Sequence, residues 1–340
     1  MNPNLGWDEA RDDEWRDSPV SLTGATPGRV VRVERNTIRV ALGDRVVTVH
    51  ANGLAVGDWV ATDGATWASL LPRRTQLARQ ASGRTSDEQV LAANVDAVLI
   101  VEPLHPAPNA RRIERMLTLA WASGARPIVV LTKSDLAERD AAPEIEAAAS
   151  GAEVVVVSSA TGANLDRLRG LIHPGQTFVL MGPSGAGKSS LVNALAGREV
   201  LETGEVRGDG KGRHTTTHRE LIVIDGLGCL IDTPGIREVG MTAHQSGLDA
   251  TFADVLDVAA ECRFHDCTHT AEPGCAVRRA VDDGLLDPAR VASFQRIERE
   301  IAQQALRKSA HDRRDERIET KSRRAGMRAV MAAKKRPRGQ

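Results

Sequence analysis

The sequence predicts a multidomain protein with an N-terminal β-barrel, a central α/β domain and a mostly helical C-terminal module. Three observations predict this architecture. Short segments with alternating apolar residues come first, near-continuous Val/Ile/Leu strands alternating with helical segments follow, and a Cys/His cluster lies in helical sequence near the end. These patterns are typical of a small antiparallel barrel, a parallel sheet covered on both faces, and a metal-binding module. A chain of 340 residues is long enough for all three.

Composition and charge bound the class of protein. Hydrophobic residues make up 41% of the chain and charged residues 26%, as in ordinary globular proteins. The formal net charge of zero conceals an acidic head and a basic tail, and we expect residues 1–26 and 311–340 to be disordered or solvated ends. No apolar stretch is long enough to span a membrane and no secretion signal is present, so we expect a cytoplasmic protein without a membrane partner.

Residues 27–82 are predicted to form the barrel. Five short segments, each bounded by Gly, Asn or Asp, suit a closed barrel of the OB type better than a sandwich, which needs more chain. OB folds commonly bind single-stranded or looped RNA, and the basic linker residues Arg73, Arg74, Arg79 and Arg84, together with the basic tail, would add phosphate contacts. Taken singly, each arginine is better explained as solvated surface.

Residues 83–242 contain a phosphate loop. The pattern Gly182-x-x-x-x-Gly187-Lys188-Ser189 follows an apolar strand and precedes a helical segment, and its glycines let backbone N–H groups face an anion. In this motif the lysine reaches the β- and γ-phosphates, and Ser189 ligates Mg²⁺. A chance glycine-rich turn would not require the flanking strand and helix. The expected phosphate-binding residues are Gly182, Pro183, Ser184, Gly185, Ala186, Gly187, Lys188, Ser189 and Ser190.

Residues for the metal and the γ-phosphate follow downstream. Asp232 ends an apolar strand and is followed by Gly235, so the carboxylate can hold Mg²⁺ through water and the glycine N–H can contact the γ-phosphate. Between this motif and the phosphate loop lies a polar, glycine-rich segment typical of a mobile switch. One of Thr215, Thr216 and Thr217 can give Mg²⁺ a second hydroxyl, and Thr216 is the expected ligand.

The base-recognition residues lie upstream of the phosphate loop. They follow two successive apolar strands and are Thr132, Lys133, Ser134, Asp135, Ser159 and Ala160. A carboxylate after Lys-x accepts hydrogen bonds from guanine N1 and N2, whereas adenine has the opposite pattern and would leave Asp135 unpaired. The sequence therefore predicts a GTPase and disfavours an ATPase. Because the base motifs precede the phosphate motifs, we expect a circularly permuted P-loop α/β GTPase domain, which requires only that the original ends lie close together.

A Cys/His cluster lies within residues 243–310. Cys262, Cys267 and Cys275 form, with one histidine, a Cys-x₄-Cys-x-His-x₅-Cys pattern that suits one structural Zn²⁺ without an open coordination position. His269 is the histidine of this pattern, and His265, inside the cluster, is the competing ligand. The alternative is three reduced cysteines that lie close in sequence by chance. We expect a zinc-binding helical domain.

The whole arrangement resembles the family of ribosome small-subunit-dependent GTPase A (RsgA). The resemblance runs from about residue 28 to residue 300 and rests on VGDWV, PRRTQLAR, AANVDAVLIV, GPSGAGKSS, GRHTTTHREL, DTPGIRE and the Cys/His cluster. It implies a monomeric cytoplasmic GTPase that binds GTP and GDP, the small (30S) ribosomal subunit and 16S-type rRNA. In late subunit maturation it would hydrolyse GTP to GDP and phosphate, stimulated by the subunit. The family's Cys-x-His spacing also favours His269 over His265.

The resemblance assigns a catalytic residue, and the sequence departs from the family at one position of the base motif. Ile236 occupies the position where Ras-like GTPases carry a water-orienting Gln, and the resemblance gives this role to His214 in the switch segment. The family usually has Asn where this chain has Thr132. Asn would bond guanine N7 and tie the base loop to the phosphate loop, and Thr can do only part of this. We therefore expect guanine preference through Asp135, with lower affinity. The alternative function is a nucleotide-gated RNA-binding factor with little catalytic turnover.

Overall fold

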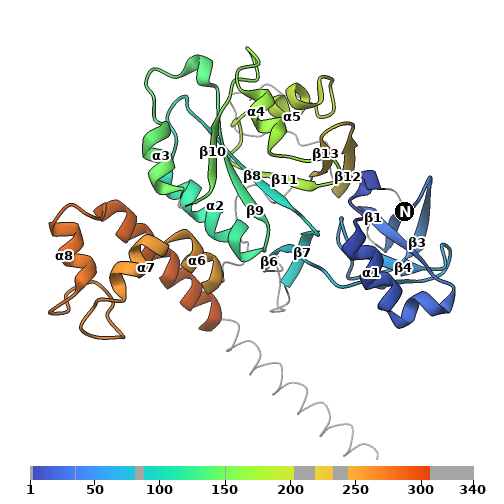
Figure 1. Cartoon of the computed structure of the whole chain (residues 1–340), viewed down its shortest axis with the longest axis horizontal. Coiled ribbons are helices and arrows are strands. Elements are labelled where there is room, and N and C mark those ends of the chain that lie inside the picture. Colours follow the sequence, from blue (N-terminus) through green and yellow to red (C-terminus); the bar gives the residue numbers. More distant parts are fainter. Residues whose placement is uncertain are drawn as a thin grey trace, which may run out of the picture.

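The structure is a computed structural model of the chain, and it describes residues 3–34, 36–80, 88–149, 151–202, 219–232 and 244–306. Figure 1 shows a small β-rich part on the right, a central α/β part and a helical part on the left. These three parts follow one another along the chain. The order agrees with the predicted architecture.

The acidic N-terminal segment is folded, and the prediction of a disordered head is wrong for its described residues. Its elements are the 3₁₀-helices η1 (Pro3–Leu5) and η2 (Pro19–Thr23) and the helix α1 (Glu9–Asp17) between them. Trp7 is buried, and its ring meets that of Trp59 edge-on with 4.8 Å between centroids. Arg11 is also buried and donates to the side chain of Asn94. A few buried side chains therefore fix a segment whose composition is dominated by charge.

The β-rich part holds five short antiparallel strands around one apolar core. The strands are β1 (Thr26–Val33), β2 (Thr37–Leu42), β3 (Arg45–His50), β4 (Trp59–Thr62) and β5 (Ala68–Leu70). Strand β1 pairs with β2 and with β4, β2 pairs with β3, and β4 pairs with β5. The core consists of Val30, Ile38, Val40, Leu42, Val49 and Val60. The strands agree with a small barrel. The described pairings do not join β3 to β5, and the OB topology stays a prediction.

The two arginines after the barrel are engaged in ion pairs. Arg73 binds the fully buried Asp58 through two nitrogens, at 2.6 and 2.7 Å. Arg74 pairs with Asp8 at 2.7 Å and with Glu14 at 3.1 Å. Both arginines precede the hairpin of β6 (Gln76–Gln80) and β7 (Glu88–Ala93). Contact with RNA stays a prediction for these arginines, and their side chains already hold the barrel and the N-terminal segment together.

The central part is a parallel sheet covered by helices on both faces, as predicted. Its strands are β8 (Ala97–Pro103), β9 (Arg126–Thr132), β10 (Glu153–Val156), β11 (Thr177–Met181), β12 (Arg219–Ile224) and β13 (Gly228–Asp232). They lie in the order β10-β9-β8-β11-β13-β12, in which only β12 runs antiparallel to its neighbour β13. The strand before the phosphate loop, β11, follows β10 in the chain and yet lies between β8 and β13. Circular permutation predicts this arrangement.

Side chains of the central strands alternate between two apolar cores. The helices are α2 (Ala110–Ala122), α3 (Ala142–Ala148), α4 (Leu165–Gly170) and α5 (Lys188–Ala196), with the 3₁₀-helix η3 (Ser134–Leu136) after β9. On β8, Val98 and Ile100 pack with α2 and α3, whereas Leu99 and Val101 pack with α4 and α5. Because both faces are buried, the strands must be almost entirely apolar, and this is the pattern that the sequence displays.

The β-rich part and the central part share one continuous sheet. Strand β1 pairs antiparallel with β12, with Arg32 opposite Glu220 and Val33 opposite Arg219. Residues 203–218 lie outside the described residues and include all of the predicted switch segment, residues 208–220, except Arg219 and Glu220, with which β12 begins. Strand pairing therefore joins the β-rich part directly to the strand that follows the switch segment.

The C-terminal part is helical and docks on α2. Its described helices are α6 (Gln245–Thr251), α7 (Ala253–Ala259), α8 (Ala276–Asp282) and a helix over residues 288–306. The buried Arg290 donates to Glu114 of α2 at 2.9 Å and to Asp254 at 2.5 and 2.7 Å. Gly247 lies so close to α2 that a Cβ there would be 2.1 Å from the carbonyl oxygen of Thr118. None of the described helices has both the length and the apolar character that a bilayer crossing demands.

Candidate nucleotide and zinc sites

The predicted nucleotide-binding residues follow strands whose carboxyl ends lie at one edge of the sheet. Strand β8 runs parallel to both β9 and β11, and β11 runs parallel to β13. Thr132 ends β9, Gly182 follows β11 and Asp232 ends β13. In open α/β sheets, ligands bind outside the carboxyl ends of the strands. The structure therefore brings the two predicted halves of the site to the same edge, although they lie in the opposite order along the chain from that of an unpermuted GTPase.

The phosphate loop has the backbone that its glycines allow. Gly182, Gly185 and Gly187 have φ angles of 149°, 77° and 87°, which residues with side chains rarely adopt. At Gly182 the restriction is also steric, because a Cβ would lie 2.1 Å from the carbonyl oxygen of Val101 on β8. The ammonium of Lys188 donates to two carbonyls at the start of the loop, at 2.7 and 2.6 Å. The side chain of Lys188 therefore folds back onto the first residues of the phosphate loop.

Thr132 joins the base motif to the phosphate loop. Its hydroxyl donates to the carbonyl oxygen of Ala186 at 2.6 Å, and the residue is 2% exposed. Thr132 is the last residue of β9, and Ala186 lies two residues before α5. One hydrogen bond therefore connects the two halves of the site. This is one of the two roles that an asparagine would fill at position 132.

Asp135 is held by a residue that the sequence analysis did not select. The hydroxyl of Ser158, whose side chain is fully buried, donates to Asp135 Oδ1 at 2.5 Å. The N–H of Ser134 donates to the carbonyl of Val157 at 3.2 Å, and Lys133, the residue before Ser134, has a φ of 58°. The sequence did point to Ser158, because it directly precedes Ser159 and Ala160, two of the predicted base-recognition residues. The bond orients the carboxylate that is predicted to recognise guanine.

Ser159 and Ala160 lie on a turn that leaves their N–H groups available. Ser159 is half-buried and Ala160 is exposed. The turn is closed by bonds to Ser158, whose hydroxyl accepts from Thr161 at 3.2 Å and whose carbonyl accepts from Gly162 at 3.0 Å. Among the described residues, no acceptor pairs with the N–H of Ser159 or of Ala160. Both N–H groups can therefore meet a ligand.

A buried carboxylate beside the site was not predicted. Glu102, near the end of β8, is fully buried and accepts from the N–H of Asn109 at 2.9 Å and from Arg112 at 2.9 and 2.5 Å. The N–H of Leu104 donates to the carbonyl of Thr132 at 2.9 Å. The segment between β8 and α2 is therefore tied to α2 on one side and to the base motif on the other. A single glutamate in an apolar strand gives no local signal for this role.

Three predicted site residues lie outside the described residues. They are His214 and Thr216 in the switch segment and Gly235 after β13. Asp232, the neighbouring member of the site, is described, is half-buried and lies opposite Glu220 in the β12–β13 register. The assignments of His214, Thr216 and Gly235 stay predictions.

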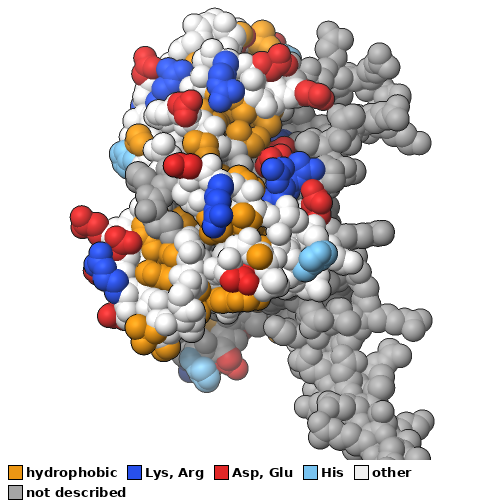
Figure 2. All heavy atoms as spheres, turned by 90° about the vertical axis from the view of Figure 1, so that its right-hand side faces the viewer, with side chains coloured by type: hydrophobic (Ala, Val, Ile, Leu, Met, Phe, Trp, Pro, Cys, Tyr) orange, Lys and Arg blue, Asp and Glu red, His pale blue; other side chains and the backbone are white. Residues whose placement is uncertain are grey.

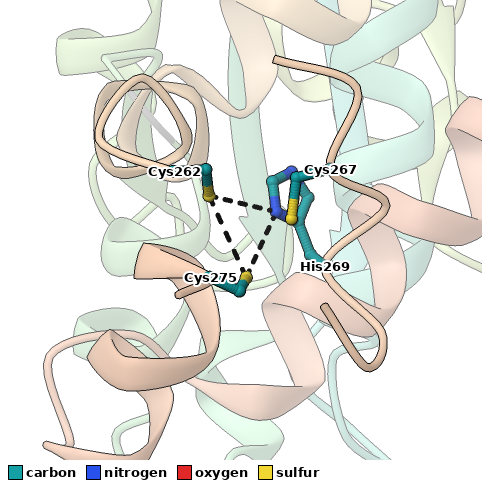
Figure 3. Close-up of side chains that lie close together, drawn as sticks. All are labelled: Cys262, Cys267, His269 and Cys275. Atoms are coloured by element: carbon teal, nitrogen blue, oxygen red, sulfur yellow. Dashed lines mark hydrogen bonds between the residues drawn. The ribbon is translucent and has the colours of Figure 1, made fainter. Parts of the chain in front are cut away.

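The four predicted zinc ligands lie together, as Figure 3 shows. The ligand atoms of Cys262, Cys267, His269 and Cys275 are all within 4.8 Å of one another. His269 Nδ1 is 3.6 Å from the sulfurs of both Cys262 and Cys275, which are 3.9 Å apart. Ordinary bond lengths in a tetrahedral zinc site separate two sulfurs by about 3.8 Å, and a sulfur and a nitrogen by about 3.6 Å. The set fits one Zn²⁺. His265, the competing ligand, is exposed and lies outside the set.

Protein groups around the cluster orient its members. The sulfurs of Cys262 and Cys275 accept backbone N–H groups at 3.3 and 3.4 Å. Burial raises the pKa of Cys262, but hydrogen bonds from backbone N–H groups and from the neighbouring cysteines together outweigh burial, so the net pKa falls below its ordinary value and the thiolate is favoured. Gln295, on the helix over residues 288–306, donates to the carbonyl of His269 at 3.2 Å. His269 has a φ of 59°, so this helix supports a backbone conformation that a histidine seldom adopts.

Two family models match the part of the chain that contains the nucleotide site. The model described as RsgA GTPase matches residues 70–242, which include both the base motif and the phosphate loop. A model described as ABC transporter matches residues 165–322, which include the phosphate loop but not the base motif at residues 132–135. The RsgA model alone therefore accounts for both halves of the site.

Relatives and solved structures agree over most of the chain. A small ribosomal subunit biogenesis GTPase RsgA from Streptomyces coelicolor is 43% identical over 98% of this chain and 95% of its own length. Another from Opitutus terrae is 47% identical over 84% and 79%. The crystal structure of YjeQ from Thermotoga maritima has a TM-score of 0.62 at 26% identity and covers 82% of this chain and 99% of that one. YloQ, a circularly permuted GTPase, has a TM-score of 0.58 at 26% identity, with coverages of 82% and 96%. The chain belongs to the RsgA GTPase family.

Proposed function

We propose that this GTP hydrolase binds the small (30S) ribosomal subunit and its 16S-type rRNA and acts in late maturation of that subunit. Relatives that match nearly the whole chain are named small ribosomal subunit biogenesis GTPases, which supports the partner. The observation that carries the nucleotide part is the Thr132–Ala186 hydrogen bond, which joins a guanine-type base motif to a phosphate loop. Subunit binding would stimulate the conversion of GTP to GDP and phosphate and then release the factor.

In this proposal GTP binds at the carboxyl edge of the central sheet. Residues 182–190 would bind the phosphates, and the base motif at residues 132–135, with Ser159 and Ala160, would bind guanine. Ser189 and Thr216 would ligate Mg²⁺, and Asp232 would hold that ion through water. Gly235 would contact the γ-phosphate. The available N–H groups of Ser159 and Ala160 and the oriented carboxylate after β9 support the base contacts.

His214 is the proposed catalytic residue. Hydrolysis by attack of water on the γ-phosphate needs a group that orients this water. At the usual position of that group lies Ile236, whose side chain has no polar atom. A histidine in the switch segment can accept a hydrogen bond from water at neutral pH. Because switch segments are ordered by ligands and partners, hydrolysis by the protein alone should be slow.

The β-rich part is the proposed rRNA contact. Figure 2 shows the face of the molecule at this end, where Lys and Arg side chains are scattered among apolar and acidic ones. Arg39 and Arg45 are exposed, and Trp67 and Leu70 have exposed fractions of 36% and 44%. Guanidinium groups suit phosphates, and an exposed indole suits base stacking on single-stranded RNA. The β1–β12 pairing would then connect bound RNA with the strand that follows the switch segment.

The proposed domains keep the boundaries expected from the sequence, except that the acidic N-terminal segment is folded. They are the acidic segment at residues 1–26, an OB-fold barrel at 27–82, the permuted GTPase domain at 83–242, the zinc-binding helical domain at 243–310 and a basic tail at 311–340. The Cys₃His set would hold one structural Zn²⁺ whose four positions are all filled by protein, so that the ion stabilises the fold and leaves no position for a substrate. The factor would act as a monomer in the cytoplasm.

Steady-state hydrolysis of GTP and ATP, with and without purified small subunits, tests the proposal. We expect slow hydrolysis of GTP alone, strong stimulation by small subunits, and no comparable effect with ATP. His214→Ala should retain GTP binding and lose the stimulated turnover. Slow GTP hydrolysis that small subunits never stimulate would support the alternative, a nucleotide-gated RNA-binding factor. Equal use of ATP would overturn the assigned role of Asp135.

A further inference from the structure

The hydroxyl of Thr132 has one proton, and the structure shows where that proton goes. A threonine hydroxyl donates one hydrogen bond. Here it donates to the carbonyl oxygen of Ala186 at 2.6 Å. Thr132 is 2% exposed and Ala186 is fully buried, so water cannot easily replace the hydroxyl if it turns away. Because an unpaired buried carbonyl is unfavourable, the hydroxyl proton stays in the hydrogen bond that joins the base motif to the phosphate loop.

Guanine has two acceptor atoms on its major-groove edge, and each can accept a hydrogen bond from a protein donor. Its O6 and N7 atoms are both acceptors, whereas N1 and N2 carry hydrogens. The carboxylate of Asp135 faces the two hydrogen-bearing positions in the proposed complex, and the free N–H groups of Ser159 and Ala160 can serve O6. In the proposed complex the donor for N7 belongs to residue 132 of the base motif, where an asparagine would bond N7. Its only proton is already used.

We infer that residue 132 of this chain joins the loops but does not read N7, so the site accepts guanine nucleotides that lack the N7 acceptor. The inference rests on the proposed function, because it concerns the base in the same nucleotide site. The ligand class is guanine and 7-deazaguanine nucleotides. Specificity resides in the N1, N2 and O6 edge, and the five-membered ring is recognised only through shape.

Dissociation constants of GDP and 7-deaza-GDP, measured with the full chain by isothermal titration, test this directly. We expect the wild-type protein to bind the two ligands with a ratio of dissociation constants within about twofold. One net hydrogen bond to N7 corresponds to a ratio of about two- to twelvefold. A wild-type preference for GDP of more than about twofold would overturn the inference.

Two variants of residue 132 distinguish a hydrogen bond between the two loops from a hydrogen bond to the base. Thr132→Val keeps the shape of the side chain and removes the hydroxyl, so it should weaken both ligands by the same factor. If the hydroxyl instead served N7, this variant would weaken GDP and leave 7-deaza-GDP unchanged. Thr132→Asn supplies an amide with two hydrogens, one for Ala186 and one for N7. It should create a preference for GDP over 7-deaza-GDP, and thermal unfolding of each variant confirms that it is folded.

The outcomes also separate this inference from the proposed function. A protein that binds GDP and rejects ATP, but discriminates against 7-deaza-GDP, would overturn the inference alone. A protein that binds neither guanine nucleotide would overturn both. Equal binding of GDP and 7-deaza-GDP in the wild type, with a gain of discrimination in Thr132→Asn, would support both.

Discussion

Replacing Arg290 by Met should weaken the contact between α2 and the C-terminal helices by about 3–5 kcal/mol. The guanidinium pairs with the side chain of Glu114, which is 4% exposed, and with that of Asp254, which is 40% exposed. It also donates to the carbonyl of Thr251 at 2.8 Å. Because Asp254 is open to water, its pair contributes at most about 1 kcal/mol. Glu114 would be left buried without a cationic partner, and this accounts for most of the loss.

The loss should depend on pH through Glu114. Burial raises the pKa of this carboxyl even with Arg290 beside it, and removal of the cation raises it further. In the unfolded chain a glutamate titrates near a pKa of about 4.3. When the folded-state pKa exceeds the unfolded-state pKa, the folded protein binds the proton more tightly and loses stability as pH rises between the two values. The deficit of the variant should therefore be smallest near about pH 4 and grow toward neutral pH.

Urea denaturation followed by circular dichroism, at acidic and at neutral pH, measures this effect. The double variant Arg290→Met/Glu114→Gln leaves no buried charge and should recover more than half of the loss. Arg296→Met, an exposed arginine on the same helix, is the matched control and should change stability by no more than about 0.5 kcal/mol. A loss of less than about 1 kcal/mol at neutral pH, or an equal loss at both pH values, would refute the reasoning.

Three further predictions concern the zinc ligands, the base motif and the N-terminal segment. Gln295→Ala should lower zinc affinity about tenfold or more, because its amide supports the backbone of His269. Competition with a chelator measures this, and an unchanged affinity would contradict it. Ser158→Ala should weaken GTP binding about tenfold, since Asp135 loses a charge-assisted hydrogen bond. Titration with GTP, set against Ser159→Ala as the neighbouring control, gives the answer. Deletion of residues 1–24 should expose the thiol of Cys229, which is fully buried and donates to the Asn4 carbonyl at 3.0 Å. Peptide mapping after thiol labelling of the zinc-loaded protein should find Cys229 modified only in the shortened chain.

The parallel sheet and its motifs could be predicted because their signals are local. Strands buried on both faces must be almost continuously apolar, and this is visible in any short window. The phosphate loop requires glycine where φ is positive, as at Gly185 and Gly187, so its pattern is also local. The predicted zinc ligands lie within one short segment, and the resemblance to the family's Cys-x-His spacing favoured His269 over His265.

Contacts between distant segments could not be predicted. The bond from Thr132 ends on a backbone carbonyl 54 positions away, and a carbonyl has no sequence signature. Glu114 and Arg290 are 176 positions apart, and each resembles an ordinary surface charge in its own helix. The N-terminal segment was misjudged for a related reason, because composition weighs all residues equally. Its fold depends on Trp7 and on Arg11, whose partners belong to other parts of the chain.

The continuous sheet has a consequence for folding during synthesis. Asn4 and Cys229, which share a hydrogen bond, are 225 positions apart, and β1 completes its pairing with β12. Strand β11 likewise pairs with β8, which precedes it, and with β13, which follows it later in the chain. On a translating ribosome β1 can pair early with β2 and β4, but it emerges long before β12, and pairing over such a separation slows folding. The β-rich part thus gains its last strand partner in the same late step that adds β13 and Asp232 to the nucleotide site, so a nascent chain does not complete one without the other.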